Sequence, residues 1–240
     1  MNNSILSALF RNVEVVMSRV ALPGTVSFSQ QRYILDRARQ YSLHADNSWA
    51  DIPVPTQLAE ECREARPCAV ETQETEEVCR VLAGIVVHVA TFSQPDVAFA
   101  AQFTSSVPSS YARLRLLRRV LGYLARTAAL RITYARSPAA EGLGFAFGGP
   151  PGQLKMPVDA DHAVDRSTTG WVIILANAVV LWAVRAQVQP SISSTEAELY
   201  GLSTAVCDLL YRASTSWRSW GASSMAPFLF SATARVLGSS

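Results

Sequence analysis

Three consecutive stretches decide the fold: VDADHAVDRSTTGWVIIL at residues 158–175, VVLWAV at 179–184 and SSTEAELYGL at 193–202. They predict a strand over residues 156–163 and a buried strand over residues 170–175. Asn177 marks a turn, so VVLWAV is expected to be the hairpin partner of the buried strand. A helix is then expected from Ser193 to about Trp220. Strands followed by a long helix indicate a mixed α/β layer.

Two aspartates stand on the first of these strands. Asp159 and Asp161 are two residues apart, so their side chains are expected on the same face of the strand. Neighbouring carboxylates repel each other unless a cation lies between them, and Mg²⁺ prefers oxygen ligands. The pair therefore indicates either a metal site or an ordinary acidic pair at the edge of a loop, beside Asp165 and Arg166.

The start of the predicted helix also carries two acids. Ser193 with Glu196, or Thr195 with Glu198, has the spacing of a capping box. At about 100° per residue, Glu198 lies about 55° and Glu196 about 105° from the centre of the helix's apolar stripe. That stripe consists of Leu199, Leu202, Val206, Leu209 and Leu210. Glu198 is therefore predicted to point toward the sheet and is the better candidate for a metal ligand.

Composition limits the class of protein. The chain has 240 residues, of which 49% are apolar and 17% charged, and its formal net charge is only +2. These values exclude a disordered tail, a coiled coil and a membrane bundle. The N-terminus has no signal-peptide pattern, and the longest apolar stretch, Val81–Phe92, is shorter than the ~20 residues that cross a bilayer. We expect an intracellular protein of the cytoplasm or nucleus, with no membrane partner.

The part of the chain before the Gly- and Pro-rich boundary at residues 141–152 has a different pattern. It predicts two strands, at residues 10–18 and 25–29, and an extended connection at 49–55. An acidic loop is expected over residues 60–80, leading into a helix. Four helices are expected, at residues 30–41, 76–92, 97–103 and 111–126. We therefore divide the chain into a first segment, 1–140, and a second domain, 150–240, with a further short strand at 227–230.

The predicted helix at 111–126 has one apolar and one basic face. Its apolar stripe is Leu114, Leu117, Leu121 and Leu124, and its arginines are Arg113, Arg115, Arg118, Arg119 and Arg126. Arginine pairs with phosphate oxygens, so this face indicates sequence-independent binding of nucleic acid. An ordinary solvated helix face would show the same pattern, and so would a docking surface for the acidic zone at residues 60–80.

The acid-rich strand, the D-R-S-T-T-G-W motif, the Trp-containing strand and S-S-T-E-A-E follow one another in an order and spacing that strongly resemble a known family. They resemble the ribonuclease H domain of copia-type LTR-retrotransposon polyproteins. Upstream, TVSFSQQRYILDRA (25–38), FSQPDVAFA (92–100) and LRRVLGYLARTAALRITY (117–134) resemble the reverse-transcriptase tail and connection of the same polyproteins. The resemblance covers about residues 8–220.

This resemblance implies a ribonuclease H fold, which has a mixed five-stranded sheet with helices, after a mostly helical connection segment. The family cuts the RNA strand of an RNA–DNA hybrid with two Mg²⁺ (or Mn²⁺) ions held by four carboxylates. By position, Asp159 matches the first-strand aspartate and Glu198 the helix glutamate, both catalytic and metal-binding. Asp161 is a neighbouring metal-ligand candidate whose role stays open. The implied partners are an RNA–DNA hybrid or other nucleic acid and the polymerase portion of the polyprotein.

The chain departs from the family at its end. Ala232 stands where the third carboxylate is expected, and no Asp, Glu or His follows Asp208. The polymerase motif Y-x-D-D is absent from the sequence. We therefore expect a C-terminally truncated, incomplete ribonuclease H-like domain that has lost activity, with Leu229 and Phe230 partly exposed and residues 221–240 poorly ordered. Two alternatives are a non-catalytic nucleic-acid-binding module and an active nuclease completed by a partner or by further sequence.

Overall fold

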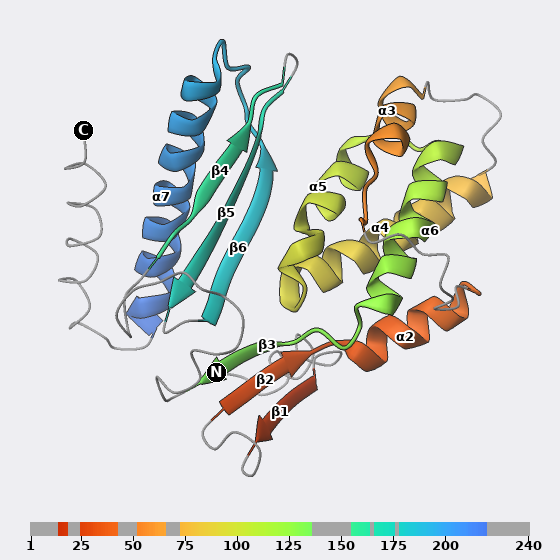
Figure 1. Ribbon diagram of the computed structural model, residues 1–240, viewed down its shortest axis with the longest axis horizontal. Helices are drawn as coiled ribbons and strands as arrows, with labels where there is room; N and C mark the ends of the chain where they lie inside the picture. Colours follow the sequence, from red (N-terminus) through yellow and green to blue (C-terminus); the bar gives the residue numbers. More distant parts are fainter. Residues whose placement is uncertain are drawn as a thin grey trace.

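The computed structural model combines helices with two antiparallel three-stranded sheets, so the chain belongs to the mixed α and β class (Figure 1). The structure describes residues 14–18, 25–42, 52–65, 73–135, 155–163, 166–175 and 178–219. The expected boundary at 141–152 and the expectations for 221–240 lie outside these residues.

The first sheet has the strand order β1-β2-β3, from β1 (Glu14–Ser18), β2 (Thr25–Ser29) and β3 (Ile132–Ala135). The central strand β2 pairs with a hairpin neighbour on one side and with the distant β3 on the other. Across the second pairing, the rings of Phe28 and Tyr134 meet edge to face with centroids 5.4 Å apart. Cross-strand aromatic pairs of this kind stabilise a sheet.

The helices between β2 and β3 build the larger core. They are α2 (Gln31–Gln40), α3 (Thr56–Glu64), α4 (Gln73–Phe92), the short 3₁₀ helix η1 (Pro95–Val97), α5 (Ala98–Ser106) and α6 (Tyr111–Arg126). The α6 stripe is confirmed, because Leu117, Leu121 and Leu124 are fully buried and Leu114 is half-buried. These leucines pack in one cluster with α4 residues such as Leu82.

The acidic zone differs from the sequence prediction. Residues 60–80 were expected to be a solvated loop leading into a helix, but α3 already occupies Thr56–Glu64. The helix forms because Leu58, Ala59 and Cys62 share one face and are buried in the core, while its glutamates remain outside. Acidic side chains therefore mark the outer face of a helix here and not a loop.

The second sheet is an antiparallel meander of β4 (Val158–Asp161), β5 (Thr168–Leu175) and β6 (Ala178–Ala186). The β5–β6 hairpin predicted from the sequence is confirmed. Helix α7 (Ser194–Ser219) packs against β4 and β5. Trp171, Ile173 and Ala205 form a small core between this sheet and the helix.

The face that α7 turns toward the sheet is centred on small residues and not on the leucine stripe. Its buried positions are Ala197, Gly201 and Ala205, whereas Leu199 is 63% and Leu210 is 41% exposed. A Cβ at Gly201 would lie 3.0 Å from Thr169 side-chain atoms. The stripe prediction is right only in part: Leu209 packs against the small core, but the closest contact is made by small residues, which allow the helix to lie nearer to the sheet than leucines would.

The two sheets belong to one connected arrangement. β6 contacts α5 and β3 (Figure 1). The indole Nε1 of Trp182 on β6 donates a 2.6 Å hydrogen bond to the Ala90 carbonyl near the end of α4, and the Tyr134 hydroxyl donates a 2.8 Å bond to the Val179 carbonyl. Within the described part of the chain, no helix has the length and apolar character needed to cross a membrane.

Candidate functional site

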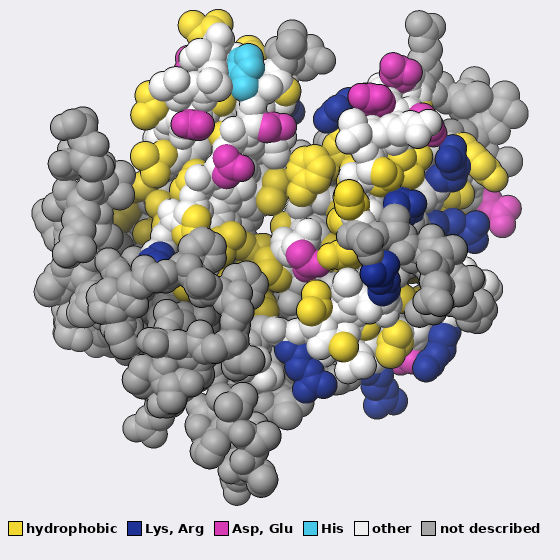
Figure 2. All heavy atoms as spheres, in the orientation of Figure 1, with side chains coloured by type: hydrophobic (Ala, Val, Ile, Leu, Met, Phe, Trp, Pro, Cys, Tyr) yellow, Lys and Arg dark blue, Asp and Glu magenta, His cyan; other side chains and the backbone are white. Residues whose placement is uncertain are grey.

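The candidate site lies where β4 ends and α7 begins. Along β4, Val158 and Ala160 are half-buried, whereas Asp159 and Asp161 are exposed. The prediction that the two aspartates share one face of the strand is therefore confirmed. Figure 2 shows acidic side chains gathered over this unit, near a histidine side chain.

The two aspartates differ in what they contact. An oxygen of Asp161 accepts a hydrogen bond from the backbone N–H of Thr168, the first residue of β5. Asp161 therefore holds the β4–β5 connection together. Asp159 is exposed and makes no hydrogen bond or ion pair within the described residues, so its carboxylate is available to a ligand.

The capping box at the start of α7 uses Ser193 and Glu196. The Ser193 hydroxyl oxygen accepts a 3.2 Å bond from the Glu196 backbone N–H, and the Glu196 carboxylate accepts a 2.7 Å bond from the Ile192 backbone N–H. Both bonds satisfy backbone donors at the helix N-terminus. Of the two pairs that the sequence allows, the structure therefore uses Ser193 with Glu196, but Glu196 bonds the N–H of Ile192, one residue before the N–H that a standard capping box uses.

Glu198 does not point into the helix–sheet contact, which corrects the sequence prediction. It is exposed, one residue after the fully buried Ala197. The side of β4 that faces α7 carries Ala160, which lies 3.4 Å from the Cβ position of Gly201. Because strand neighbours point to opposite faces, Asp159 leaves β4 on the side away from α7.

These carboxylates are not gathered into a ready-made metal centre. Among the described residues, no group of three or more His, Cys, Asp or Glu side chains is arranged to hold a metal ion. Asp159 leaves β4 on the side away from α7, which carries Glu198, and both side chains are exposed, so this arrangement fits at most a weakly held, largely hydrated Mg²⁺ at one carboxylate. It does not fit the two adjacent ions of the implied nuclease.

A buried polar network, which sequence reasoning missed, fixes the start of α7 on the sheet. Gln187 is 3% exposed, and its Nε2 donates to the Thr169 hydroxyl (2.9 Å) and to the Ala197 carbonyl (2.8 Å). The Ser191 hydroxyl donates to Gln187 Oε1 at 2.8 Å. One glutamine thus connects β5, β6 and α7 and sets the position of Glu198. No pattern in the sequence marks it, because its partners meet only in the fold.

The arginines of α6 fall into two groups. Arg115 makes a 3.0 Å ion pair with Glu61 of α3, and Arg113 is half-buried and donates to the Ser109 hydroxyl. For Arg115, the structure therefore supports the interpretation that α6 docks against the acidic helix α3.

The second group consists of Arg118, Arg119 and Arg126. Arg118 is exposed and Arg119 half-buried, and neither has a hydrogen-bond or ion-pair partner among the described residues. The Arg119 Nε is itself buried without a partner. Arg126 is exposed at the end of the helix. The phosphate-binding interpretation remains open for these three positions.

Fold and site together define a mixed α and β protein with exposed carboxylates at a strand–helix junction and a separate basic helix face. The chain is similar to the secreted RxLR effector protein 161 of Plasmopara viticola, with 29% identity over 137 residues, which are 53% of this chain and 86% of that protein. No protein-family model matches the sequence, and no solved structure matches it.

Proposed function

We propose that the chain is a catalytically inactive remnant of a copia-type reverse transcriptase/ribonuclease H polyprotein, with a ribonuclease H-like unit in its second part. The order of elements supports this proposal. Three antiparallel strands, β4, β5 and β6, are followed by α7, with Asp159 on the first strand and Glu198 in the first turns of the helix. The resemblance places the first two carboxylates of the family on these two elements.

The chemistry of the site supports inactivity. The family uses two divalent ions about 3.5–4 Å apart, one to activate the attacking water and one to stabilise the leaving oxygen. Two such cations need several carboxylates to balance their mutual repulsion. This chain supplies Asp159 and Glu198, and Ala232 stands in the place of the third carboxylate. We therefore expect hydrolysis to be lost.

The test is cleavage of a fluorescent RNA–DNA hybrid by the full chain, with Mg²⁺ or Mn²⁺. Asp159→Asn is the informative variant, because Asp159 is exposed and has no partner within the described residues, so we expect its replacement to leave the fold unchanged. We expect the wild-type chain and the variant to give the same background. Cleavage by the wild type that disappears in Asp159→Asn but persists in the control Glu76→Gln would overturn the proposal.

A second candidate function is non-catalytic binding of nucleic acid through α6. The observation that favours it is the exposed Arg118, which has no ion-pair partner in the described part of the chain, beside Arg119. Arginines that neutralise phosphates release counterions, so binding must weaken with salt. We expect salt-dependent binding to an RNA–DNA hybrid, with a shallower log–log slope in Arg118→Ala/Arg119→Ala. Absence of binding at low salt would exclude this function.

A further inference from the structure

Helix α2 adds a second set of arginines to the basic face of α6. The two helices pack against each other. Together they carry eight arginines and a single acid, Asp36, and the α2 arginines are Arg32, Arg37 and Arg39. Figure 2 shows basic side chains gathered over these two helices, apart from the acidic side chains over the β4–α7 unit.

The outer surface of this helix pair is almost wholly polar. The exposed residues of α2 are Arg32, Asp36, Arg39 and Gln40, and those of α6 are Arg115, Arg118 and Arg126 together with Tyr111 at its start. Protein–protein interfaces have an apolar centre, whereas surfaces that bind nucleic acid are more polar and strongly positive. The exposed surface of the helix pair is of the second kind, polar and strongly positive.

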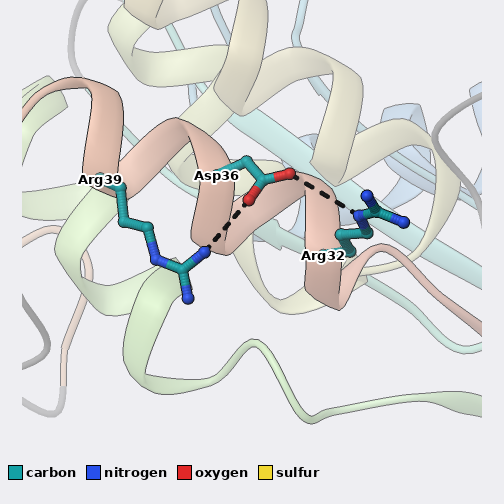
Figure 3. Close-up of polar contacts among 3 residues, drawn as sticks. All are labelled: Arg32, Asp36 and Arg39. Carbon is teal, nitrogen blue, oxygen red and sulfur yellow. Dashed lines mark hydrogen bonds and ion pairs between the residues drawn. The ribbon is translucent and has the colours of Figure 1, made fainter.

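One carboxylate partly neutralises the α2 arginines. Asp36 lies between Arg32 and Arg39, with N–O distances of 3.9 Å and 3.3 Å (Figure 3). The three side chains are between 56% and 86% exposed. Ion pairs this exposed contribute little to stability, so a phosphate can replace Asp36 as the partner of either arginine.

We propose that α2 and α6 form one binding surface for the phosphates of an RNA–DNA hybrid, and that Asp36 weakens this binding by competing for Arg32 and Arg39. The proposal rests on the nucleic-acid-binding function proposed for α6 and extends it to a second helix. Arginine suits this role because its planar guanidinium forms paired hydrogen bonds with phosphate oxygens. The chain uses arginine almost exclusively, with Lys155 as its single lysine.

The decisive variant is Asp36→Asn, because a merely structural ion pair and a competing one predict opposite results. We expect Asp36→Asn to bind a short fluorescent RNA–DNA hybrid about 2–5-fold more tightly at low salt, with the gain disappearing at high salt. The double variant Arg32→Ala/Arg39→Ala should bind more weakly and lose about 1–2 units of log–log salt slope, at about 0.9 per phosphate contact.

The matched control is Glu76→Gln on α4. Glu76 pairs with Arg80 at 3.0 Å with the same i,i+4 spacing as Arg32 and Asp36, and its side chain is 58% exposed against 56% for Asp36. Because the charge that it removes belongs to α4 and not to α2 or α6, we expect unchanged affinity. Thermal melting followed by circular dichroism checks that every variant is folded.

Three results would overturn parts of this reasoning in distinguishable ways. No binding by the wild-type chain at low salt would remove the nucleic-acid-binding function itself. Wild-type binding with Asp36→Asn equal to Glu76→Gln would remove the role of α2 while leaving that of α6. Binding of poly-glutamate as tightly as the hybrid would exclude the phosphate assignment in favour of an acidic protein partner.

Discussion

Two glycines in long helices offer a direct test of how α7 meets the sheet. Gly201 of α7 is buried against β4 and β5, whereas Gly84 of α4 is exposed. A Cβ at Gly84 would meet no atom within 4 Å, but a Cβ at Gly201 would lie 3.0 Å from both Cγ2 and Oγ1 of Thr169. The same substitution, glycine to alanine, therefore tests open space in one helix and close contact in the other.

The expected free energies follow from these contacts. Alanine stabilises a helix interior by about 0.5–1 kcal/mol relative to glycine. Gly84→Ala should show this gain in full, because nothing surrounds the added methyl group. In Gly201→Ala the same gain is opposed by an overpacking penalty of about 1–3 kcal/mol, since the sheet or the helix must move. We expect a net loss of up to about 2.5 kcal/mol, and of about 1 kcal/mol at the middle of both ranges.

The assay is urea unfolding followed by circular dichroism at equilibrium, with the midpoint and the slope compared between variants. Gly84→Ala should raise the midpoint and Gly201→Ala should lower it. A second substitution, Thr169→Ser, removes the Cγ2 methyl but keeps the hydroxyl that accepts from Gln187. It should restore part of the stability lost in Gly201→Ala. If Gly201→Ala instead raises the midpoint as much as Gly84→Ala, the close helix–sheet contact is refuted.

Three further substitutions test other contacts. Trp182→Phe removes the donor to the Ala90 carbonyl and should lower the free energy of unfolding by about 1 kcal/mol, while an unchanged urea midpoint would show that this bond does not stabilise the chain. Ser193→Ala should cost about 1 kcal/mol by the same measurement, because it removes the α7 cap, and Ser194→Ala is the control. Burial lowers the pKa of His88 below its usual 6.5. Near and below that pH the unfolded chain therefore binds more protons than the folded chain, and the free energy of unfolding should decrease as the pH is lowered. His88→Gln should flatten this dependence in melts between about pH 5 and 7, and an unchanged slope would contradict the assignment.

Sequence patterns predicted helix α6 to the residue. Its bounds, Tyr111–Arg126, were predicted from the leucine stripe, and the structure adds Ser110, which accepts the Arg113 backbone N–H as the helix cap. The β5–β6 hairpin could also be predicted from the sequence, because a turn residue separates two apolar runs. Local patterns sufficed in these elements since periodicity and capping agree with the final packing.

The orientation of α7 could not be predicted in this way. A stripe analysis favours leucine over alanine, but the sheet beneath α7 presents the small side chains Ala160 and Thr169. Close approach of the helix through Gly201 then leaves Leu199 outside. The outcome depends on the shape of a partner that the helix sequence does not contain. The position of Glu198 depends on the same contact and was mispredicted for the same reason.

The placement of charge makes binding and hydrolysis separable in this chain. The carboxylates Asp159 and Glu198 belong to the β4–α7 unit, and the arginines Arg32, Arg39 and Arg118 belong to α2 and α6. The units contact each other through β6 rather than through either charged surface. Neutralising Asp159 therefore should not change the affinity for an RNA–DNA hybrid. A large change in hybrid affinity in Asp159→Asn, with the fold intact, would instead place the hybrid across both units.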